Sequence, residues 1–207
     1  KTFIYKIQLV IKEIIEKIFS LILIIIVSPI IFISIILIYK EDQGPVIYSQ
    51  KRVGLKGKIF NVYKLRTMKV NAEKGKAQWA QSNDPRVTKT GKFLRLTRFD
   101  ELPQLISVIN GNMSLIGPRP ERPELDEDLI DQIPYYKERY LLKPGLSGWA
   151  QVNYPYGANK KDSENKLSYD LFYIKRFSIL FDALIFIKTI KLVFNLEGSI
   201  PKGEENV

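Results

Sequence analysis

The sequence predicts a mainly α-helical fold with a small β element, attached to one face of a membrane. Three observations support this class. Residues 18–39 are strongly apolar and uncharged, and apolar side chains recur at helical spacing before this run and near the C-terminus. Two short stretches, 46–49 and 58–65, have the β-branched and aromatic composition of strands. The length of 207 residues is that of one domain with a sizeable core.

Residues 1–17 are predicted to form an amphipathic helix. The polar residues Lys6, Lys12, Glu13 and Lys17 occupy much of one face. The opposite face carries apolar side chains at helical spacing: Phe3, Ile4, Ile7, Val10, Ile11, Ile14 and Ile15. Such a helix lies along lipid head groups.

The apolar run at residues 18–39 is long enough to cross a bilayer, because a straight helix of this length measures about 33 Å. Its length and the lack of a small-residue cleavage site argue against a signal peptide. However, Ser28-Pro29 lies in the middle, and proline kinks or breaks a helix. Both flanks are rich in lysine, a feature of cytoplasmic flanks. A hairpin that enters and leaves on the same side satisfies both flanks; a kinked span is the alternative.

The rest of the chain alternates short strands, loops and helices. Gly54 and Gly57 separate the two strands of a small hairpin. Asn110-Gly111 is a good C-cap for a helix at 102–109. The other predictions are a loop or short helix at 71–84, helices at 125–140, 163–173 and 179–194, and an irregular segment at 144–157. The helix at 179–194 fits either the core or the membrane surface.

The predicted division of the chain has three parts. Residues 1–40 form the interfacial and membrane helices. Residues 41–197 form a catalytic domain on the cytoplasmic face, with amphipathic helices that contact the membrane. Residues 198–207 form a frayed tail.

Composition excludes several kinds of site. The chain has no cysteine and no histidine, which rules out disulfides, thiolate or imidazole metal sites and Ser-His-Asp catalysis. Any metal must bind to carboxylates, which favours magnesium or manganese. The net charge is +10, and residues 51–98 contain fourteen Lys or Arg against Glu73 and Asp84. Such a block attracts an anion unless it is an ordinary solvated surface. No nucleic-acid motif accompanies it, so we predict no nucleic-acid partner.

The segment 84–124 carries the candidate chemistry. The carboxylate pair Asp100-Glu101 precedes a rigid Pro118-Arg119-Pro120 turn. Five cations stand before the pair: Arg86, Lys89, Lys92, Arg95 and Arg98. Nearby positive charge lowers a carboxyl pKa, so both carboxylates are predicted to be ionised. An ionised aspartate beside phosphate-binding arginines is suited to phosphoryl transfer. The structural alternative is a capping box, with Thr97 as N-cap and Asp100 at the third position.

Several motifs in the chain resemble the bacterial sugar transferase family, the monotopic polyprenol-phosphate phosphoglycosyl transferases. They read, in order, QKRVGLKGKIFNVYKLRTM, DPRVTKTGKFLR, DELPQ, GNMSLIGPRP, KPGLSGWAQVNYPYG and YDLFYIKRFSILFDALIFIKT. The resemblance covers nearly the whole chain. Two residues depart from the pattern, Ser107 where Asn is usual and Asn112 where an acidic residue is common, and neither touches the carboxylate pair.

The resemblance implies a fold and an activity. The fold is a membrane-associated monotopic α+β domain with a re-entrant N-terminal helix hairpin, broken at Ser28 and Pro29. The activity is transfer of a sugar-1-phosphate from a nucleoside diphosphate sugar to polyprenyl phosphate. The wording PRPERPE and NYPYGA resembles exopolysaccharide-type members, which favours UDP-glucose or UDP-galactose as donor. The expected location is the cytoplasmic face of the bacterial inner membrane; membrane lipids are partners and homo-oligomer formation is left open.

The resemblance also implies residue roles. Asp100 attacks the sugar-side phosphorus to give a covalent aspartyl phosphosugar. It also binds Mg²⁺, with Mn²⁺ as the alternative ion. Glu101 helps to deprotonate or position the lipid phosphate.

The phosphate-binding candidates are basic residues near the pair. Arg119, on its stiff turn, suits bidentate phosphate binding, unless it is simply solvated. Arg95 reaches phosphate if its segment folds back, and Lys64 and Arg66 at the strand end are weaker candidates. The opposing hypothesis is a non-enzymatic membrane adaptor, whose basic face binds anionic lipid or polyanions. It explains the charge but not the ordered motifs.

Overall fold

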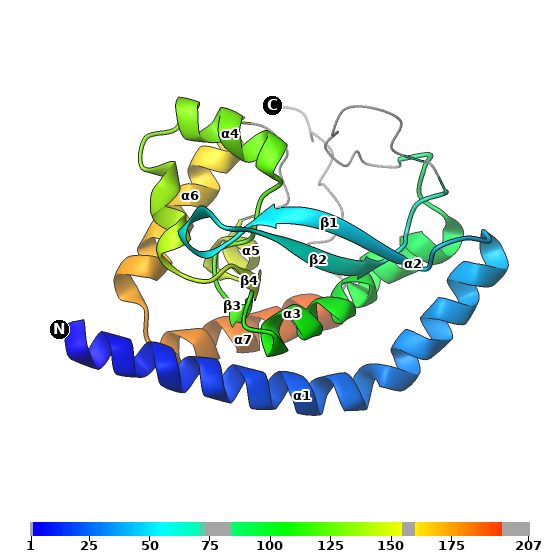
Figure 1. The fold of residues 1–207 in the computed structure, drawn as a ribbon, viewed down its shortest axis with the longest axis horizontal. Helices are drawn as coiled ribbons and strands as arrows, with labels where there is room; N and C mark the ends of the chain where they lie inside the picture. The colour runs from blue at the N-terminus through cyan, green and yellow to red at the C-terminus, as the bar shows by residue number, and fades with distance from the viewer. Residues whose placement is uncertain (1, 71, 73–83, 155–159, 196–207) are drawn as a thin grey trace.

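A computed structural model describes residues 2–70, 72, 84–154 and 160–195 (Figure 1). One 40-residue helix, α1 (Thr2–Glu41), runs along one side of the molecule, and the other elements lie on its inner side. The architecture is mainly helical with two small sheets. This confirms the predicted class of a mainly α fold with a small β element.

Helix α1 continues through Pro29 and bends (Figure 1). Proline has no N–H to donate to the carbonyl four residues earlier, which here belongs to Ile25. The Ser28 hydroxyl donates to that carbonyl instead, at 2.8 Å. The Ser-Pro pair therefore bends the helix without ending it. The two predicted N-terminal helices are one, and the predicted re-entrant hairpin is not shown.

Both halves of α1 contact the same domain. Lys12 and Glu16 in the first half are buried against β3 (Ser114–Ile116) and α7 (Ile179–Phe194). In the second half, Ile38 belongs to a core cluster with Leu65 and Leu94. At its end, the Glu41 carboxylate accepts from the backbone N–H groups at the start of α2 (Lys89–Thr97), at 2.7 and 2.8 Å.

The predicted β-hairpin is confirmed. Strands β1 (Ile47–Val53) and β2 (Ile59–Leu65) are antiparallel, joined through a short 3₁₀ turn, η1 (Leu55–Gly57). A second pair was not predicted: β3 and β4 (Gly145–Ser147) run parallel. Their backbones approach so closely that a Cβ on Gly145 would lie 2.1 Å from the Gly117 nitrogen. Three-residue strands are too short to show a sequence period.

The remaining helices agree with the predictions only in part. The helix predicted at 125–140 is wrong in its second half: α4 (Pro123–Gln132) ends early, and a 3₁₀ helix, η3 (Tyr136–Leu141), follows. The segment predicted to be irregular contains β4 and α5 (Trp149–Asn153). Helix α6 (Lys160–Arg176) contains the predicted 163–173 helix, and α7 has the predicted bounds. Residues 73–83 and the tail at 198–207 lie outside the described residues.

Helix α7 is half core and half surface. Ile185 is fully buried in the main core cluster, with Val62, Leu105 and Tyr173. Its other face exposes large apolar side chains: Leu180, Leu184, Ile187, Ile190 and Phe194. The core environment predicted for this helix is confirmed for one face, and the opposite face is exposed.

Candidate active site

The carboxylate pair lies on a short 3₁₀ helix, η2 (Phe99–Gln104). Arg98, in the left-handed conformation with φ of 58°, separates η2 from α2. The Thr97 hydroxyl donates to the carbonyls of Phe93 and Leu94, so Thr97 belongs to the end of α2. The capping-box alternative is therefore wrong. Adjacent side chains on a 3₁₀ helix diverge by about 120°, which turns the two carboxylates to different sides.

Glu101 forms the centre of an ion-pair cluster. One of its carboxylate oxygens accepts from Lys64 Nζ at 2.6 Å and from Arg119 Nη2 at 2.7 Å. Burial acts to raise the pKa of Glu101, but Arg119 and Lys64 together hold it well below its usual range. Glu101 is therefore an ionised, weakly basic group that fixes two cations drawn from β2 and from the turn after β3.

Asp100 is buried but not engaged. Within the described part of the chain, its carboxylate makes no hydrogen bond or ion pair, and 9 % of the residue is exposed. Burial raises the pKa of Asp100 to about 6, although the positive charges of Lys64, Arg95 and Arg119 oppose this. The predicted lowering of the pKa is thus correct for Glu101 and wrong for Asp100. The reason is that burial outweighs the neighbouring cations where no cation pairs directly.

The structure brings most of the predicted phosphate-binding residues together. Lys64, Arg95 and Arg119 all act on the Asp100 charge. Arg95 Nε also donates to the Thr67 hydroxyl at 2.8 Å, which steadies its side chain. Arg66 lies elsewhere: its guanidinium pairs with Asp42, just beyond α1. Arg66 therefore holds the end of α1 rather than joining the carboxylate pair.

Two cations of the site were not among the predicted binding residues. Arg98 and Arg52 both interact electrostatically with Glu101 and Arg119. Arg52 also donates to the Pro120 carbonyl at 3.0 Å. Arg98 was visible in the basic run before the pair, but Arg52 lies far away in sequence on β1. Val53 N of β1 donates to Glu121 O at 3.0 Å, and this contact between β1 and the turn brings Arg52 to the site.

The charge balance of the site favours a polyanion. Each of five cationic side chains, Lys64, Arg52, Arg95, Arg98 and Arg119, interacts electrostatically with at least one of the carboxylates Asp100, Glu101 and Glu121. The excess positive charge matches a diphosphate, whose oxygens accept from guanidinium groups.

The residues are compatible with a magnesium ion shared with a substrate. The described residues contain no group of three acidic side chains that could hold a metal alone. Asp100, however, has carboxylate oxygens that no described side chain occupies. Mg²⁺ commonly binds through one or two carboxylates together with substrate phosphates, and this donor set fits that pattern.

The chain contains a helix suited to a membrane. Among the described residues, Phe3–Glu41 is long and apolar enough to cross one, with a mean hydropathy of 3.3 in its most apolar window. Only 11 % of that window is buried inside the protein. Its apolar side chains are therefore available to lipid.

Comparison with known proteins places this site in a family context. Residues 7–196 match the family described as Bacterial sugar transferase. The chain is 44 % identical over 172 residues to a UDP-N-acetylgalactosamine-undecaprenyl-phosphate N-acetylgalactosaminephosphotransferase of Aeromonas hydrophila, covering 83 % of this chain and 41 % of the relative. It is 38 % identical over 177 residues to a UDP-glucose:undecaprenyl-phosphate glucose-1-phosphate transferase of Escherichia coli (strain K12), covering 84 % and 38 %.

A third relative is similar in length. The chain is 53 % identical over 131 residues to a putative undecaprenyl-phosphate N-acetylgalactosaminyl 1-phosphate transferase of Bacillus subtilis (strain 168), covering 63 % of this chain and 73 % of the relative. The chain thus matches less than half of the Aeromonas and Escherichia proteins. Because the family match extends over nearly all of its residues, the chain belongs to the bacterial sugar transferase family.

Proposed function

We propose that this protein transfers a sugar-1-phosphate from a UDP-sugar to undecaprenyl phosphate. The products are undecaprenyl-diphosphate-sugar and UMP, and the reaction begins the membrane assembly of an exopolysaccharide or another glycoconjugate. Family membership and the activities named for its relatives support this reaction. The observation that carries the proposal is the unengaged, buried Asp100 carboxylate beside Lys64, Arg95 and Arg119.

In the first half-reaction, an Asp100 oxygen attacks the phosphorus that bears the sugar. The bond from that phosphorus to the bridging oxygen breaks, UMP leaves, and an aspartyl phosphosugar remains on the enzyme. The donor brings two phosphates into a site with excess positive charge. Lys64, Arg95 and Arg119 orient them and offset the charge that develops on the departing UMP.

In the second half-reaction, an oxygen of undecaprenyl phosphate attacks the same phosphorus. The Asp100–phosphorus bond breaks, which releases the lipid product and restores the carboxylate. Burial acts to raise the pKa of Glu101, but Arg119 and Lys64 outweigh it and hold the pKa low. Glu101 is therefore a weak base. Its role in this proposal is to position these two cations for the phosphates, rather than to remove a proton.

The proposed cofactor is Mg²⁺, with Mn²⁺ as the alternative ion. Asp100 and oxygens of the donor diphosphate would hold it, since the described residues offer no complete acidic cluster. When bound, the ion neutralises phosphate charge and favours the ionised form of Asp100.

We propose that the protein is a monotopic membrane protein on the cytoplasmic face of the bacterial inner membrane. Lys12 and Glu41 lie about 44 Å apart along α1, and both contact the same domain. A helix that crossed a core of about 30 Å would carry one of these ends to the far side, away from the domain. The bend at Pro29 therefore supports a helix that enters the membrane and returns, with the apolar faces of α1 and α7 in lipid.

The experiment that tests the proposal is turnover of UDP-sugars with Mg²⁺ and undecaprenyl phosphate. The protein should release UMP and, without the lipid, retain labelled phosphosugar covalently. Asp100→Asn should abolish both with an unchanged unfolding temperature, because Asn has nearly the same volume. Labelling of the Asp100→Asn protein would show that another residue is the nucleophile.

A membrane adaptor would release no UMP under any of these conditions. Turnover of a panel of UDP-sugars identifies which sugar the protein transfers. UDP-glucose and UDP-galactose are the donors favoured by the motifs, and UDP-N-acetylgalactosamine is the donor named for a relative.

A further inference from the structure

The turn that carries Arg119 is held in place from outside. Pro118 and Pro120 have no backbone N–H, so the turn has few donors with which to stabilise itself. Its three successive carbonyls each accept a hydrogen bond from a different element. Gly145 N of β4 donates to Pro118 O at 2.9 Å, and Arg52 Nη1 of β1 donates to Pro120 O at 3.0 Å. The middle carbonyl belongs to Arg119 itself.

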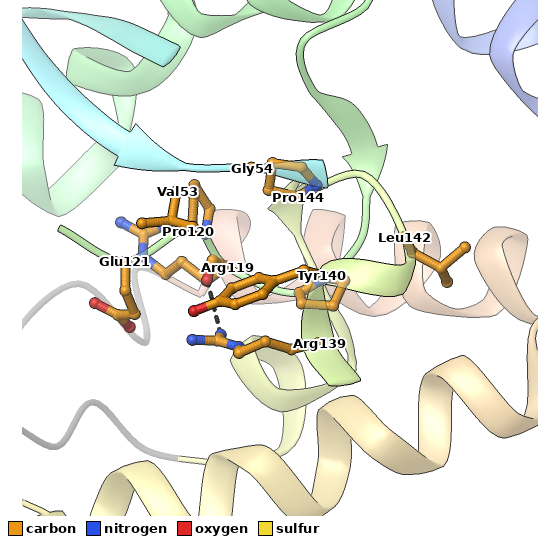
Figure 2. Close-up of a pocket in the computed structure, with 10 residues that line it drawn as sticks. Val53, Gly54, Arg119, Pro120, Glu121, Arg139, Tyr140, Leu142 and Pro144 are labelled. Carbon is orange, nitrogen blue, oxygen red and sulfur yellow. Dashed lines mark hydrogen bonds between the residues drawn. The ribbon is translucent and has the colours of Figure 1, made fainter. Parts of the chain in front are cut away.

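The donor to this middle carbonyl is Arg139 of η3. Its Nη2 lies 2.8 Å from Arg119 O, as Figure 2 shows by the dashed line. The cavity between the turn and η3 measures about 10 Å³, about the room of a single water. Arg139 therefore packs closely behind the turn, and the cavity is far too small for a nucleotide sugar.

Arg139 is itself fixed by a buried network. Its Nη2 pairs with Asp170 Oδ2 of α6 at 2.9 Å, and its Nη1 donates to the Tyr136 hydroxyl at 2.6 Å. Side chains of the ion pair are 7 % and 3 % exposed. A buried ion pair is weak support for stability alone, because desolvation cancels much of the attraction. Its geometry, however, leaves one N–H of the guanidinium fork directed at the Arg119 carbonyl.

We infer that Arg139, oriented by Asp170, is a positioning residue for Arg119 and sets the enzyme's affinity for the diphosphate of its donor. This rests on the proposed function, in which Arg119 binds a substrate phosphate. Arg139 fixes the backbone carbonyl of Arg119. The guanidinium of Arg119, which extends from this fixed backbone, donates to Glu101 at 2.7 Å. Loss of the Arg139 bond frees the turn and misaligns this guanidinium.

A double-mutant cycle with UDP as the probe tests the inference. Arg139→Lys keeps a charge beside Asp170 but loses the planar fork that serves three acceptors. It should weaken UDP binding about tenfold or more, the effect of losing one charge-assisted hydrogen bond. In an Arg119→Ala background the same change should alter UDP binding less than about twofold, because the guanidinium that it positions is gone.

Two further variants separate positioning from folding. Arg139→Met with Asp170→Leu removes the buried pair together, which such sites tolerate, and should weaken UDP binding as Arg139→Lys does. Tyr140→Phe removes the neighbouring bond to Asp126 and leaves the donors to the turn intact, so UDP binding should not change.

The outcomes are distinct. Equal losses from Arg139→Lys in both Arg119 backgrounds, or no loss in either, would overturn the positioning role. Failure of the unaltered protein to bind UDP, or of Arg119→Ala to weaken that binding, would instead overturn the proposed function.

Discussion

At the scale of single residues, the properties of the site depend on which of the two carboxylates pairs directly with a cation. Asp100 and Glu101 are adjacent in sequence, yet their pKa values move in opposite directions. Burial raises the pKa of Asp100 to about 6. Burial also acts on Glu101, but direct pairing with Arg119 and Lys64 holds its pKa well below the usual range. The pair thus combines a free carboxylate for chemistry with a fixed one that organises the cations.

Glu101→Gln should lower the stability of the free enzyme. The change leaves Lys64 and Arg119 facing each other without a shared acceptor charge, and breaking such a buried cluster costs about 3 kcal/mol. Because Glu101 no longer positions the two cations for the phosphates, UDP should raise the unfolding temperature less in this variant than in the unaltered protein. Thermal unfolding with and without UDP measures both effects. An unchanged unfolding temperature in the absence of UDP would contradict this account of Glu101.

At the scale of elements, two polar contacts stabilise α1. One is the Ser28 hydrogen bond at the bend, and the other, here called the latch, joins Lys12 to Asp182 and Ile116 of the domain. The Ser28 hydroxyl satisfies the Ile25 carbonyl that Pro29 leaves without a partner. Lys12 Nζ donates to Asp182 Oδ2 at 2.6 Å and to the Ile116 carbonyl at 2.8 Å. The latch therefore joins the membrane helix to α7 and to the strand that leads into the Arg119 turn.

Ser28→Ala should destabilise the protein by about 1–3 kcal/mol, the cost of a carbonyl left without a partner in apolar surroundings. Pro29→Ala in the same chain should restore stability, because the new N–H bonds to Ile25 O. Ser34→Ala is the matched control: its hydroxyl also donates to a carbonyl, Ile30 O, at 2.8 Å, but no proline removes that carbonyl's backbone donor. Unfolding in lipid nanodiscs measures all three, and a Ser34→Ala loss as large as that of Ser28→Ala would argue against the repair.

Lys12→Met should cost about 3–5 kcal/mol, because it leaves Asp182 buried without its cation. Adding Asp182→Leu should recover much of this loss. Lys17→Met removes an exposed pair with Glu13 on the same helix and should cost less than about 1 kcal/mol. Chemical denaturation in detergent gives the comparison. If the single Lys12 variant were as stable as the double variant, the latch would have no role in holding α1.

At the scale of the whole molecule, the domain lies along both halves of one bent apolar helix (Figure 1). Large apolar side chains of α1 and α7 are exposed, and together they offer lipid a surface. An aqueous donor and a lipid acceptor must meet at one carboxylate, so a domain held against one membrane face suits the proposed reaction.

The proposed topology predicts that both ends of α1 stay in the cytoplasm. Thr2→Cys and Ser49→Cys can be made singly, since the chain has no cysteine. In intact cells both positions should be shielded from an impermeant thiol reagent and become labelled after lysis. Labelling of position 2 alone in intact cells would mean that α1 crosses the membrane.

The sequence by itself determined the class of fold, the β1–β2 hairpin, α7, the family and the carboxylate pair. These features depend on local periods, turn residues and motifs that are contiguous in the chain. It predicted a helix break at Pro29, but the repair depends on a hydroxyl whose rotamer no sequence pattern reports. Likewise the predicted cations Lys64 and Arg66 are two residues apart, yet their side chains pair with Glu101 and Asp42 respectively.

Only the tertiary structure decided what surrounds each charge. The contact of β1 with the Arg119 turn brings Arg52 to the site, the close approach of β3 and β4 fixes the turn, and Arg139 reaches Arg119 from 20 residues away. The pKa of Asp100 follows from burial, which sums over elements distant in sequence. Local sequence sets which charges exist, but desolvation and pairing act through space, so their outcome belongs to the folded chain.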